Sequence, residues 1–425
     1  MKIDPEQCGL STRAVHVGND PSGRPEDGTG AVTVPIYQTS TYQQATVGED
    51  AEYEYARVHN PTRAALERNV AALEGGATGH AFASGMAAIS TLMSVLDPGD
   101  EVVASRDVYG GTRRLFNQVL ARYGLVFHWL DTTRTETVAA ILKARPRVRM
   151  IYVETPSNPM MEISDIAALA ELAHRNQALL AVDNTFLSPY FQRPLELGAD
   201  VALHSTTKFM GGHSDSLGGV LITARHTDPA ITGQALANVY EGNLGAHFAY
   251  QQKCSGAVAA PFECFLILRG LRTLAVRMAR HEENGQRLAS FLAANRGRVV
   301  RRVVYPGLDD HPGHAVQRRQ ASGFGAMIAL DLDSATAARR FLESLRVFTL
   351  AESLGGVESL ASLPALMTHA SVSAEVRATL GITGSLVRLS VGIETYGDLE
   401  ADVAQALEQA AAETSRSREV ERVPC

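Results

Sequence analysis

Residues 202–219, ALHSTTKFMGGHSDSLGG, carry a single lysine, Lys208, between small hydroxyl residues and a run rich in glycine. The apolar run at residues 199–204 directly before it has the length of a buried strand, so Lys208 is predicted to lie just past the carboxyl end of a strand. A lysine taken alone is usually a solvated surface residue. What Lys208 does therefore depends on what the rest of the chain places beside it.

Short apolar runs alternate with longer segments of helical periodicity on the N-terminal side of this stretch. Strands are expected at residues 80–83, 101–104, 126–130, 150–154 and 179–183, and helices at residues 64–74, 86–96, 112–123, 136–144 and 166–176. Strands that alternate with helices of this length form right-handed βαβ units. We therefore expect an α/β fold with a mixed, mostly parallel sheet and helices on both of its faces.

Three parts of the chain differ in pattern. Residues 1–62 are rich in Gly, Pro, Thr and Tyr and show little periodicity, which indicates an extended arm without a core of its own. Residues 63–268 contain the alternating strands and helices and form the expected large domain. Residues 269–425 include a long helix through residues 277–294 and a closing helix at residues 399–412, with strand patterns between them that indicate a smaller α+β domain.

Composition argues against several classes of protein. The chain has 425 residues and a formal net charge of -7, and this mild acidity argues against nucleic acid or an anionic membrane surface as the main partner. No apolar run reaches the roughly 20 residues of a membrane span, and the N-terminus lacks the apolar core of a signal peptide, so a cytoplasmic location is expected. The four cysteines are scattered and no cluster has the spacing of metal ligands, so no metal site is expected.

Polar residues follow three of the expected strands at the edge where parallel α/β sheets bind their ligands. Ser84 and Gly85 open a helix, whose exposed amides and dipole favour a phosphate group. Asp183 ends one strand, and Lys208 follows the next. A phosphate site, a carboxylate and an amine together meet the needs of pyridoxal phosphate, which takes a lysine as covalent anchor and a carboxylate beside its ring nitrogen.

Other phosphate-binding and hydrolase motifs are absent from the sequence. No GxxxxGK[ST] loop occurs, since Thr206 and Thr207 rather than glycine precede Lys208. The glycines at residues 75–79 follow a helix instead of a strand, which is the wrong context for dinucleotide binding. No GxSxG elbow is present either, so pyridoxal phosphate is the ligand that the pattern favours.

These residues belong to motifs spread in order along nearly the whole chain. The motifs are PIYQTST (35–41), YAR (55–57), NPTR (60–63), ASG (83–85), DVYGGT (107–112), ETPSNP (154–159), VDNT (182–185), STTKFMGGHS (205–214), AESLGGVES (351–359), MTHA (367–370) and VRLSVG (387–392). With them the sequence closely resembles the pyridoxal-phosphate-dependent enzymes of Cys/Met metabolism, the group of cystathionine γ-synthases and γ-lyases. The resemblance implies a fold-type I transferase whose C-terminal domain binds the substrate carboxylate.

The resemblance implies a cofactor site built around three catalytic residues. Lys208 would hold the cofactor covalently and then move protons, Asp183 would pair with the ring nitrogen, and Tyr109 would stack on the ring and assist proton transfer. Further cofactor-binding residues would be Gly85, Met86, Thr185, Ser205 and Thr207, together with Tyr55 and Arg57, which in this family reach the phosphate of the neighbouring subunit. The site would thus need at least a dimer, and the family is typically tetrameric.

A second set of residues would bind the substrate, a small sulfur amino acid. Arg388 would bind its α-carboxylate, for which a guanidinium suits better than an ammonium, and Asn158 and Ser353 would assist. Arg114 would either meet the far end of a long substrate or form a surface salt bridge. Glu352 stands where γ-acting members carry a glutamate, which could recognise the distal amino group of cystathionine.

The resemblance implies chemistry at Cγ of the substrate, and more than one outcome remains open. We favour the α,γ-elimination of cystathionine to cysteine, 2-oxobutanoate and ammonia, a transsulfuration reaction, because residues 363–370 and 37–41 look more like γ-lyases. The alternatives are γ-replacement on O-succinyl- or O-acetylhomoserine, as in a cystathionine γ-synthase, and a specialised C–S lyase. A non-catalytic pyridoxal-phosphate protein is a further alternative, although binding alone would not need all the residues named above.

Three features depart from the family pattern and leave the natural substrate open. His59 precedes Asn60, where glycine is usual, and Ser216 and Leu217 replace a customary valine pair. Residues 226–249 form a longer connection than is usual in the family. This inserted segment could add a cap over the site or a contact between subunits.

Overall fold

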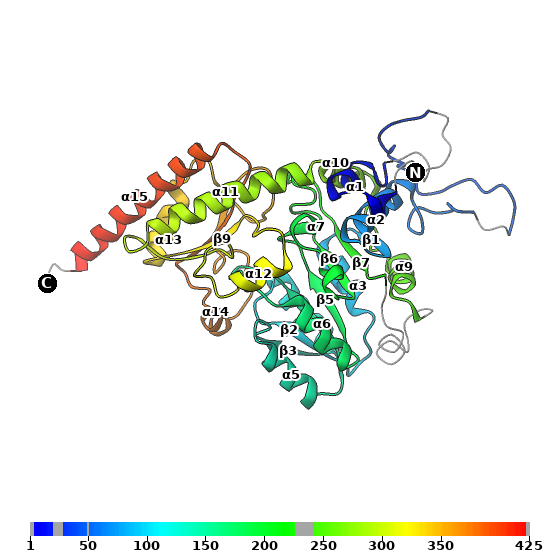
Figure 1. Ribbon diagram of the computed structural model, residues 1–425, viewed down its shortest axis with the longest axis horizontal. Coiled ribbons are helices and arrows are strands. Elements are labelled where there is room, and N and C mark those ends of the chain that lie inside the picture. The colour runs from blue at the N-terminus through cyan, green and yellow to red at the C-terminus, as the bar shows by residue number, and fades with distance from the viewer. Residues whose placement is uncertain (1–3, 20–28, 49–50, 226–241, 422–425) are drawn as a thin grey trace.

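The computed structural model describes residues 4–19, 29–48, 51–225 and 242–421 (Figure 1). Its larger sheet has seven strands, in the order β1-β7-β6-β5-β4-β2-β3. They are β1 (Thr78–Phe82), β2 (Glu101–Ser105), β3 (Val126–Leu130), β4 (Val148–Glu154), β5 (Leu179–Asp183), β6 (Val201–His204) and β7 (Gly219–Thr223). Only β7 runs antiparallel, to both β1 and β6, so the expected mixed, mostly parallel sheet is confirmed.

Helices cover both faces of this sheet. On one face lie α5 (Thr135–Ala144) and α6 (Ile166–Arg175), and on the other lie α3 (Gly85–Met93) and α9 (Leu244–Ser255). The central strand β5 is buried along its whole length. Its Leu180 and Val182 join the core beneath α5 and α6, whereas Leu179 and Ala181 join the core beneath α3 and α9. Since side chains alternate across a strand, a strand covered on both sides must be apolar throughout, as β5 is.

Further helices belong to the large domain. They are α2 (Pro61–Glu74), α4 (Gly110–Arg114), α7 (Ser188–Phe191) and α10 (Pro261–Leu271). The start of α2 is fixed by its sequence, because the Asn60 side chain accepts hydrogen bonds from the amides of Thr62 and Arg63 and Pro61 occupies the first turn. The helix ends at Gly75, which adopts the left-handed conformation with φ 73°.

Two predictions for the large domain are wrong. The strand β7 is missing from the sequence prediction, although its residues GVLIT read as a short buried strand. Its first residue shows how close the strand comes to the start of α3, since a Cβ on Gly219 would lie 2.4 Å from the carbonyl oxygen of Ser84. The helix expected at residues 112–123 is broken after Arg114 into a wide π turn (Leu115–Val119) and a 3-10 turn (Leu120–Tyr123). In this π turn the side chain of Phe116 is fully buried.

The C-terminal part forms a second, five-stranded sheet in the order β10-β11-β12-β9-β8. The strands are β8 (Val300–Val304), β9 (Met327–Leu332), β10 (Thr349–Leu350), β11 (Leu360–Ser362) and β12 (Leu386–Ser390), and the helices are α11 (Leu274–Ala294), α12 (His314–Gln320), α13 (Ala335–Ser344), α14 (Ala374–Leu380) and α15 (Tyr396–Glu421). Figure 1 shows α11 running along one edge of the molecule and α15 reaching outward at the C-terminal end. The closing helix is thus longer than the expected residues 399–412.

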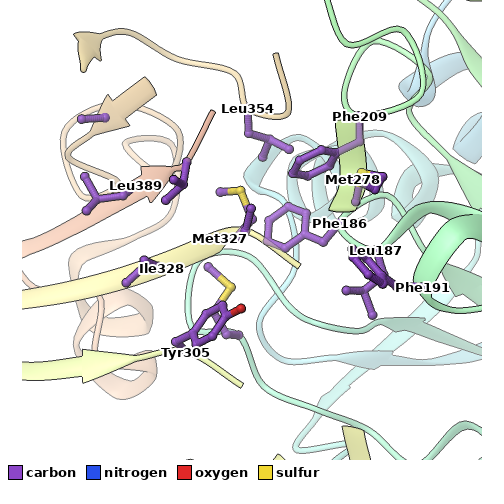
Figure 2. Packing of buried hydrophobic residues seen from close by; sticks show 14 of the residues in the cluster. Phe186, Leu187, Phe191, Phe209, Met278, Tyr305, Met327, Ile328, Leu354 and Leu389 are labelled. Carbon is purple, nitrogen blue, oxygen red and sulfur yellow. The ribbon is translucent and has the colours of Figure 1, made fainter. Parts of the chain in front are cut away.

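One continuous apolar core joins the two sheets. Figure 2 shows Phe186 and Phe209 of the large domain lying close to Met327 and Leu354 of the C-terminal part. Met278 of α11 belongs to the same cluster and is fully buried. The core therefore holds the two parts together, although the boundary that we place between residues 268 and 269 stays a prediction.

The N-terminal residues contain one short helix, α1 (Leu10–His16), after a 3-10 turn (Pro5–Gln7). Ala14 of α1 is buried, and the Asn69 side chain of α2 donates hydrogen bonds to the carbonyls of Ala14 and Val17 at 3.2 and 2.7 Å. The described residues between 29 and 60 have one isolated bridge, Thr41 to Tyr55, as their only β pairing. The role of residues 1–62 as an arm toward a second subunit is not decided by these contacts.

Candidate functional site

A cavity of about 450 Å³ lies between the two parts of the molecule, at the ends of several strands. Most of the residues expected to bind cofactor or substrate line this one cavity. They are Gly85, Met86, Tyr109, Asn158, Asp183, Thr185, Ser205, Thr207, Lys208, Glu352, Ser353 and Arg388. The rule that ligands bind beyond the carboxyl ends of parallel strands therefore gives the correct place for the large-domain residues.

Lys208 lies in the turn that follows β6, with its amine inside the cavity. The Nζ atom donates a hydrogen bond to the hydroxyl of Ser353 at 2.7 Å. The pKa of Lys208 is lowered to about 8 by burial and, to a smaller extent, by the charge of Arg388, while Glu352 acts in the opposite direction. The neutral amine, which is the form that attacks a carbonyl group or takes a proton, is therefore more abundant near neutral pH than it is for an ordinary lysine.

The turn after Lys208 is fixed by a residue that the sequence reasoning missed. Arg277 of α11 is 3% exposed and donates hydrogen bonds to the carbonyls of Phe209 and Met210 at 2.6 and 3.2 Å. A third bond reaches the carbonyl of Gly270 at 2.8 Å. A lone arginine in a helix has no local signal that separates it from a solvated surface residue, so only the tertiary contact reveals it.

Asp183 is the last residue of β5, where this strand pairs with β6, and its side chain lines the cavity. The Oδ1 atom accepts hydrogen bonds from the amide and the hydroxyl of Thr185, at 3.1 and 2.5 Å, and the Tyr152 phenol donates to Oδ2 at 3.3 Å. Burial raises the pKa of Asp183, and the hydrogen bonds from Thr185 oppose this shift. A cation beside the carboxylate would keep it ionised, and a protonated pyridine nitrogen is such a cation.

The start of α3 forms one side of the cavity and has the features of an anion site. The Ser84 side chain caps the helix by accepting a hydrogen bond from the amide of Ala87 at 3.1 Å. Gly85 and Met86 occupy the first turn, where amides have no acceptor within the helix and the dipole favours an anion. Gly85 also lies close to Ser205, since a Cβ on it would be 3.0 Å from the Cβ of Ser205. The four residues form a small, polar cradle that fits a phosphate group.

Arg388 of β12 supplies the cationic side of the cavity. Its side chain is 2% exposed, and it donates one hydrogen bond to Asn158 Oδ1 at 3.0 Å and another to the carbonyl of Ser353 at 2.7 Å. Its Nε atom is buried without a hydrogen-bond partner among the described residues. Burial lowers the pKa of Arg388 to about 10. A buried guanidinium with an unused N–H group fits a bound carboxylate, which would supply both charge and acceptor atoms.

Ser353 connects the amine and the guanidinium. Its hydroxyl accepts the hydrogen bond from Lys208, and its carbonyl accepts the one from Arg388. The residue has φ 86°, a backbone conformation that residues with a side chain rarely adopt. Such strain is maintained only where the surrounding structure fixes it, and it occurs frequently at functional sites.

Tyr109 stands at the entrance to the cavity and is 41% exposed. Its amide donates a hydrogen bond to Glu154 Oε2 at 2.9 Å. Its ring lies against Gly111, where a Cβ would be 2.4 Å from the Tyr109 Cε1 atom, so the glycine makes room for the ring. Glu154 itself lines the cavity, and burial and the nearby Asp183 raise its pKa well above the ordinary value. The sequence reasoning placed Glu154 at a strand end and assigned it no role.

Three of the expected site residues do not line this cavity. Arg114 lines a separate, smaller cavity of about 220 Å³ beside α4, so both of its predicted roles remain untested. Tyr55 and Arg57 lie at the surface, with the Arg57 guanidinium 5.4 Å from the centre of the Tyr55 ring. Arg57 also donates a hydrogen bond to the carbonyl of Lys253 at 2.6 Å. An action on a neighbouring subunit requires surface side chains of this kind, and it stays a prediction.

The departures from the family pattern lie in three different places. Leu217 lines the cavity and is 62% exposed. Ser216 lines an adjoining space of about 620 Å³ that shares Thr207 and Glu352 with the main cavity. His59 is exposed, and its Nδ1 lies 3.1 Å from the carbonyl of Glu52. Of the inserted segment, residues 226–241 lie outside the described part of the chain.

Two kinds of feature are absent from the part of the chain that the structure describes. No group of three or more His, Cys, Asp or Glu side chains in residues 4–19, 29–48, 51–225 and 242–421 is arranged to hold a metal ion. No helix in the same ranges has the length and apolar character required to cross a membrane.

Comparison with known proteins agrees with this geometry. A cystathionine gamma-lyase of Bacillus subtilis is 46% identical over 383 residues, which is 90% of this chain and 96% of that protein. A cystathionine beta-lyase of Lactococcus lactis is 44% identical over 400 residues, 94% of this chain and 99% of that protein. The crystal structure of a cystathionine gamma synthase from Xanthomonas oryzae, in complex with aminoacrylate and cysteine, superposes with a TM-score of 0.87 at 41% identity and covers 96% of this chain and 99% of that one.

The family model described as Cys/Met metabolism PLP-dependent enzyme matches residues 11–408. The match includes both sheets and every residue that lines the main cavity. The cradle at α3, the carboxylate of Asp183 and the amine of Lys208 suit the phosphate, the ring nitrogen and the reactive carbon of pyridoxal phosphate respectively. The chain therefore belongs to the pyridoxal-phosphate-dependent enzymes of cysteine and methionine metabolism.

Proposed function

We propose that this chain is a carbon–sulfur lyase that cleaves cystathionine by α,γ-elimination, with cysteine, 2-oxobutanoate and ammonia as products. The observation that carries the proposal is the pair of opposite charges in the cavity, Arg388 and Glu352. The unused Nε–H of Arg388 suits the α-carboxylate of an amino acid. Glu352, whose charge acts on both Arg388 and Lys208, suits the second ammonium group that cystathionine carries at its far end.

The side chains of the large domain would handle protons. Pyridoxal phosphate, when bound, supplies a ring that accepts negative charge from the substrate Cα. Lys208, with its lowered pKa of about 8, takes the proton from Cα and returns protons at neighbouring carbons. Asp183 holds the proton on the ring nitrogen, and the Thr185 hydrogen bonds keep the carboxylate in place for this task.

The side chains of the C-terminal part would hold the substrate. Arg388 binds the α-carboxylate, while Asn158 and the Ser353 carbonyl fix the plane of its guanidinium. The phenol of Tyr109, at the entrance, would assist proton transfer to the departing thiol. Because the residues for proton transfer and for binding the α-carboxylate come from different parts of the chain, the large domain and the C-terminal part must be in contact for turnover.

A second candidate function is γ-replacement on an O-acylhomoserine with cysteine as the attacking thiol. The space of about 620 Å³ beside Glu352 favours it, since a replacement reaction needs room for a second amino acid. The cystathionine gamma synthase among the similar structures also supports γ-replacement as a candidate. A specialised C–S lyase that acts on another thioether is the remaining alternative.

One set of incubations separates these functions. The purified enzyme is incubated with cystathionine, and separately with O-succinyl- or O-acetylhomoserine plus cysteine, while the 2-oxo acid, the free thiol and new thioether are measured. The proposal expects 2-oxobutanoate and cysteine from cystathionine. Pyruvate and homocysteine would instead show β-elimination, and formation of cystathionine from an O-acylhomoserine at the higher rate would show γ-replacement. Turnover of none of these substrates would overturn both proposed functions.

The proposal also includes a cytoplasmic homotetramer built from active dimers. Tyr55 and Arg57 would then complete the site of a second copy, in agreement with their surface position. Subunit exchange tests this point, because Lys208→Ala and Arg57→Ala inactivate different halves of a shared site. A mixture of the two variants should recover part of the activity, and a mixture as inactive as its components would contradict the shared site.

A further inference from the structure

A fully buried tyrosine, Tyr152 of β4, lies beside the carboxylate of Asp183. Tyr152 pairs with Ala181 across β4 and β5, so Asp183, two residues further along β5, has its side chain on the same face of the sheet. The phenol oxygen of Tyr152 lies 3.3 Å from Asp183 Oδ2. A carboxylate only accepts hydrogen bonds, so the phenol is the donor. Burial and the charges of Asp183 and Glu154 raise the pKa of Tyr152 well above its ordinary value, so this donor keeps its hydrogen.

The two oxygens of Asp183 are bonded unequally. Oδ1 accepts two hydrogen bonds, both from Thr185, whereas among the described residues Oδ2 accepts only the one from Tyr152. Each oxygen of a carboxylate has about two acceptor sites, so Oδ2 has one left for the N–H group of a bound ring. Burial raises the pKa of Asp183, and the hydrogen bonds from Thr185 and Tyr152 lower it. These bonds therefore favour the charged carboxylate.

The ring of Tyr152 packs against the π turn (Leu115–Val119) that replaces part of the predicted helix. Phe116 is the one buried residue of this turn. Its ring meets Tyr152 edge-to-face, with the ring centres 5.4 Å apart and the planes at 76°, and it stacks on Phe127 of β3 at 4.4 Å. Both arrangements are favourable for aromatic pairs. Single π turns are found frequently at functional sites, and this one packs against the residue that binds Asp183.

The hydroxyl is what distinguishes Tyr152 from a residue that only packs. A phenylalanine has the same ring and would make the same contact with Phe116. A hydroxyl in a fully buried position is unfavourable unless it is hydrogen-bonded, and here its partner is a carboxylate at the cavity. The placement of the hydroxyl thus points to an effect on Asp183.

We propose that Tyr152 is a positioning residue for the cofactor, which keeps Asp183 ionised so that the ring nitrogen retains its proton, and that the π turn holds the Tyr152 ring through Phe116. The inference rests on the proposed function, since it takes Asp183 as the partner of the ring nitrogen. A hydrogen bond that stabilises the charged carboxylate favours the proton on the nitrogen over the proton on the oxygen. Tyr152 thus acts on the reaction through Asp183.

The first experiment observes the ring nitrogen by NMR, in holoenzyme loaded with ¹⁵N-labelled pyridoxal phosphate and without substrate. Tyr152→Phe keeps the ring and removes the hydroxyl, so the nitrogen signal should move from that of a protonated pyridine toward that of an unprotonated one. With substrate, kcat should fall about fivefold, the size expected for one hydrogen bond, and the KM should change much less. An unchanged nitrogen signal in Tyr152→Phe would overturn the proposal.

Tyr305→Phe is the matched control. Tyr305 is also fully buried, and its hydroxyl donates a hydrogen bond to the carbonyl of Gly325 at 2.9 Å, within the core that joins the two sheets (Figure 2). Tyr305→Phe therefore removes a buried phenol hydrogen bond that does not involve Asp183. It should leave the nitrogen signal and kcat at their wild-type values. Equal shifts in Tyr305→Phe and Tyr152→Phe would show a general effect of destabilisation and overturn the proposal.

The second experiment tests the π turn. Phe116→Leu removes the ring contact with Tyr152, so the nitrogen signal should shift in the same direction as in Tyr152→Phe. The double variant Phe116→Leu, Tyr152→Phe should shift no further than Tyr152→Phe alone, because Phe116 acts through the hydroxyl. Additive shifts would overturn the role of the π turn.

Failure of the proposed function is distinguishable from failure of this inference. If the wild type does not convert cystathionine, the proposed function fails, while the nitrogen signal, recorded without substrate, still decides the role of Tyr152. An unprotonated nitrogen in wild-type holoenzyme would overturn the inference whatever the substrate is.

Discussion

The two sides of the cavity are built in different ways. On the large-domain side, Asp183 is the last residue of β5, and Gly85 and Lys208 lie in the first few residues after β1 and β6, so the sheet places them together. On the other side, Ser353 and Thr368 lie in loops, and Arg388 lies within β12, whose contact with the large domain depends on the shared apolar core. The positions of the residues on the large-domain side follow from the order of strands and turns along the chain. The positions of the residues on the other side follow from how the C-terminal part packs against the large domain. Cofactor binding and substrate binding should therefore respond differently to substitutions.

The largest effect is expected on the large-domain side. Lys208→Ala removes the proton-transferring amine, so turnover should fall at least about a thousandfold, and the visible absorption band of lysine-linked cofactor should disappear. Steady-state kinetics and an absorption spectrum measure the two effects. Lys143→Ala on the exposed surface of α5 is the control and should change neither. Full activity in Lys208→Ala would contradict the proposed chemistry.

On the opposite side, Arg388→Leu should separate substrate binding from cofactor binding. Loss of the buried cation should raise the KM for cystathionine about a hundredfold, while the lysine-linked cofactor band remains. Arg388→Lys keeps the charge and loses the planar guanidinium, so its KM should lie between those of the wild type and Arg388→Leu. A variant that lost cofactor and substrate affinity together would show that the two sides do not act separately.

The core between the two sides can be tested with two phenylalanines. Phe209 and Phe341 are both fully buried in this core, but Phe209 is the residue next to Lys208, whereas Phe341 lies in α13 of the C-terminal part. Truncation of either to alanine should reduce the free energy of unfolding by about 3–5 kcal/mol. Only Phe209→Ala should also weaken cofactor retention during dialysis. Equal loss of cofactor from both variants would argue against a special role for the part of the core next to Lys208.

The smallest effect concerns the charge of the Lys208 amine in cofactor-free protein. Its lowered pKa of about 8 means that the neutral, reactive form increases as pH rises through about 8, so capture of cofactor should accelerate over this range. Glu352 raises this pKa and Arg388 lowers it. Glu352→Gln should thus move the pH profile to lower pH, and Arg388→Leu should move it to higher pH. Stopped-flow absorbance over a pH series measures the profile, and shifts of the opposite sign would contradict the placement of these charges.

The contrast between the two sides also explains what the sequence could predict. The strand ends, the helix cap at Ser84 and the pair of Asp183 and Lys208 follow from periodicity and turn residues, and the structure brings them together. The position of Arg388 was expected only because the chain resembles a known family. A short apolar strand that contains one arginine carries no signal of the cavity that the arginine faces.

Other features could not be predicted because their cause is a contact between distant residues. Arg277 binds backbone carbonyls of the turn after Lys208, which lies far away in the sequence. The strand β7 can pass beside Ser84 because its first residue, Gly219, has no side chain. His369 lies against the carbonyl groups of Val108 and Asn158, which the fold brings to its ring. In each case the sequence contains the residue and the tertiary structure supplies its partner.

The bridging position of Ser353 has a consequence for how the two sides of the cavity are coupled. One residue accepts hydrogen bonds from both the amine and the guanidinium, through its hydroxyl and its carbonyl. Any displacement of its loop by more than about the length of a hydrogen bond, about 3 Å, breaks both connections in one movement. The positions of the Lys208 amine and of the Arg388 guanidinium are therefore coupled through a single residue.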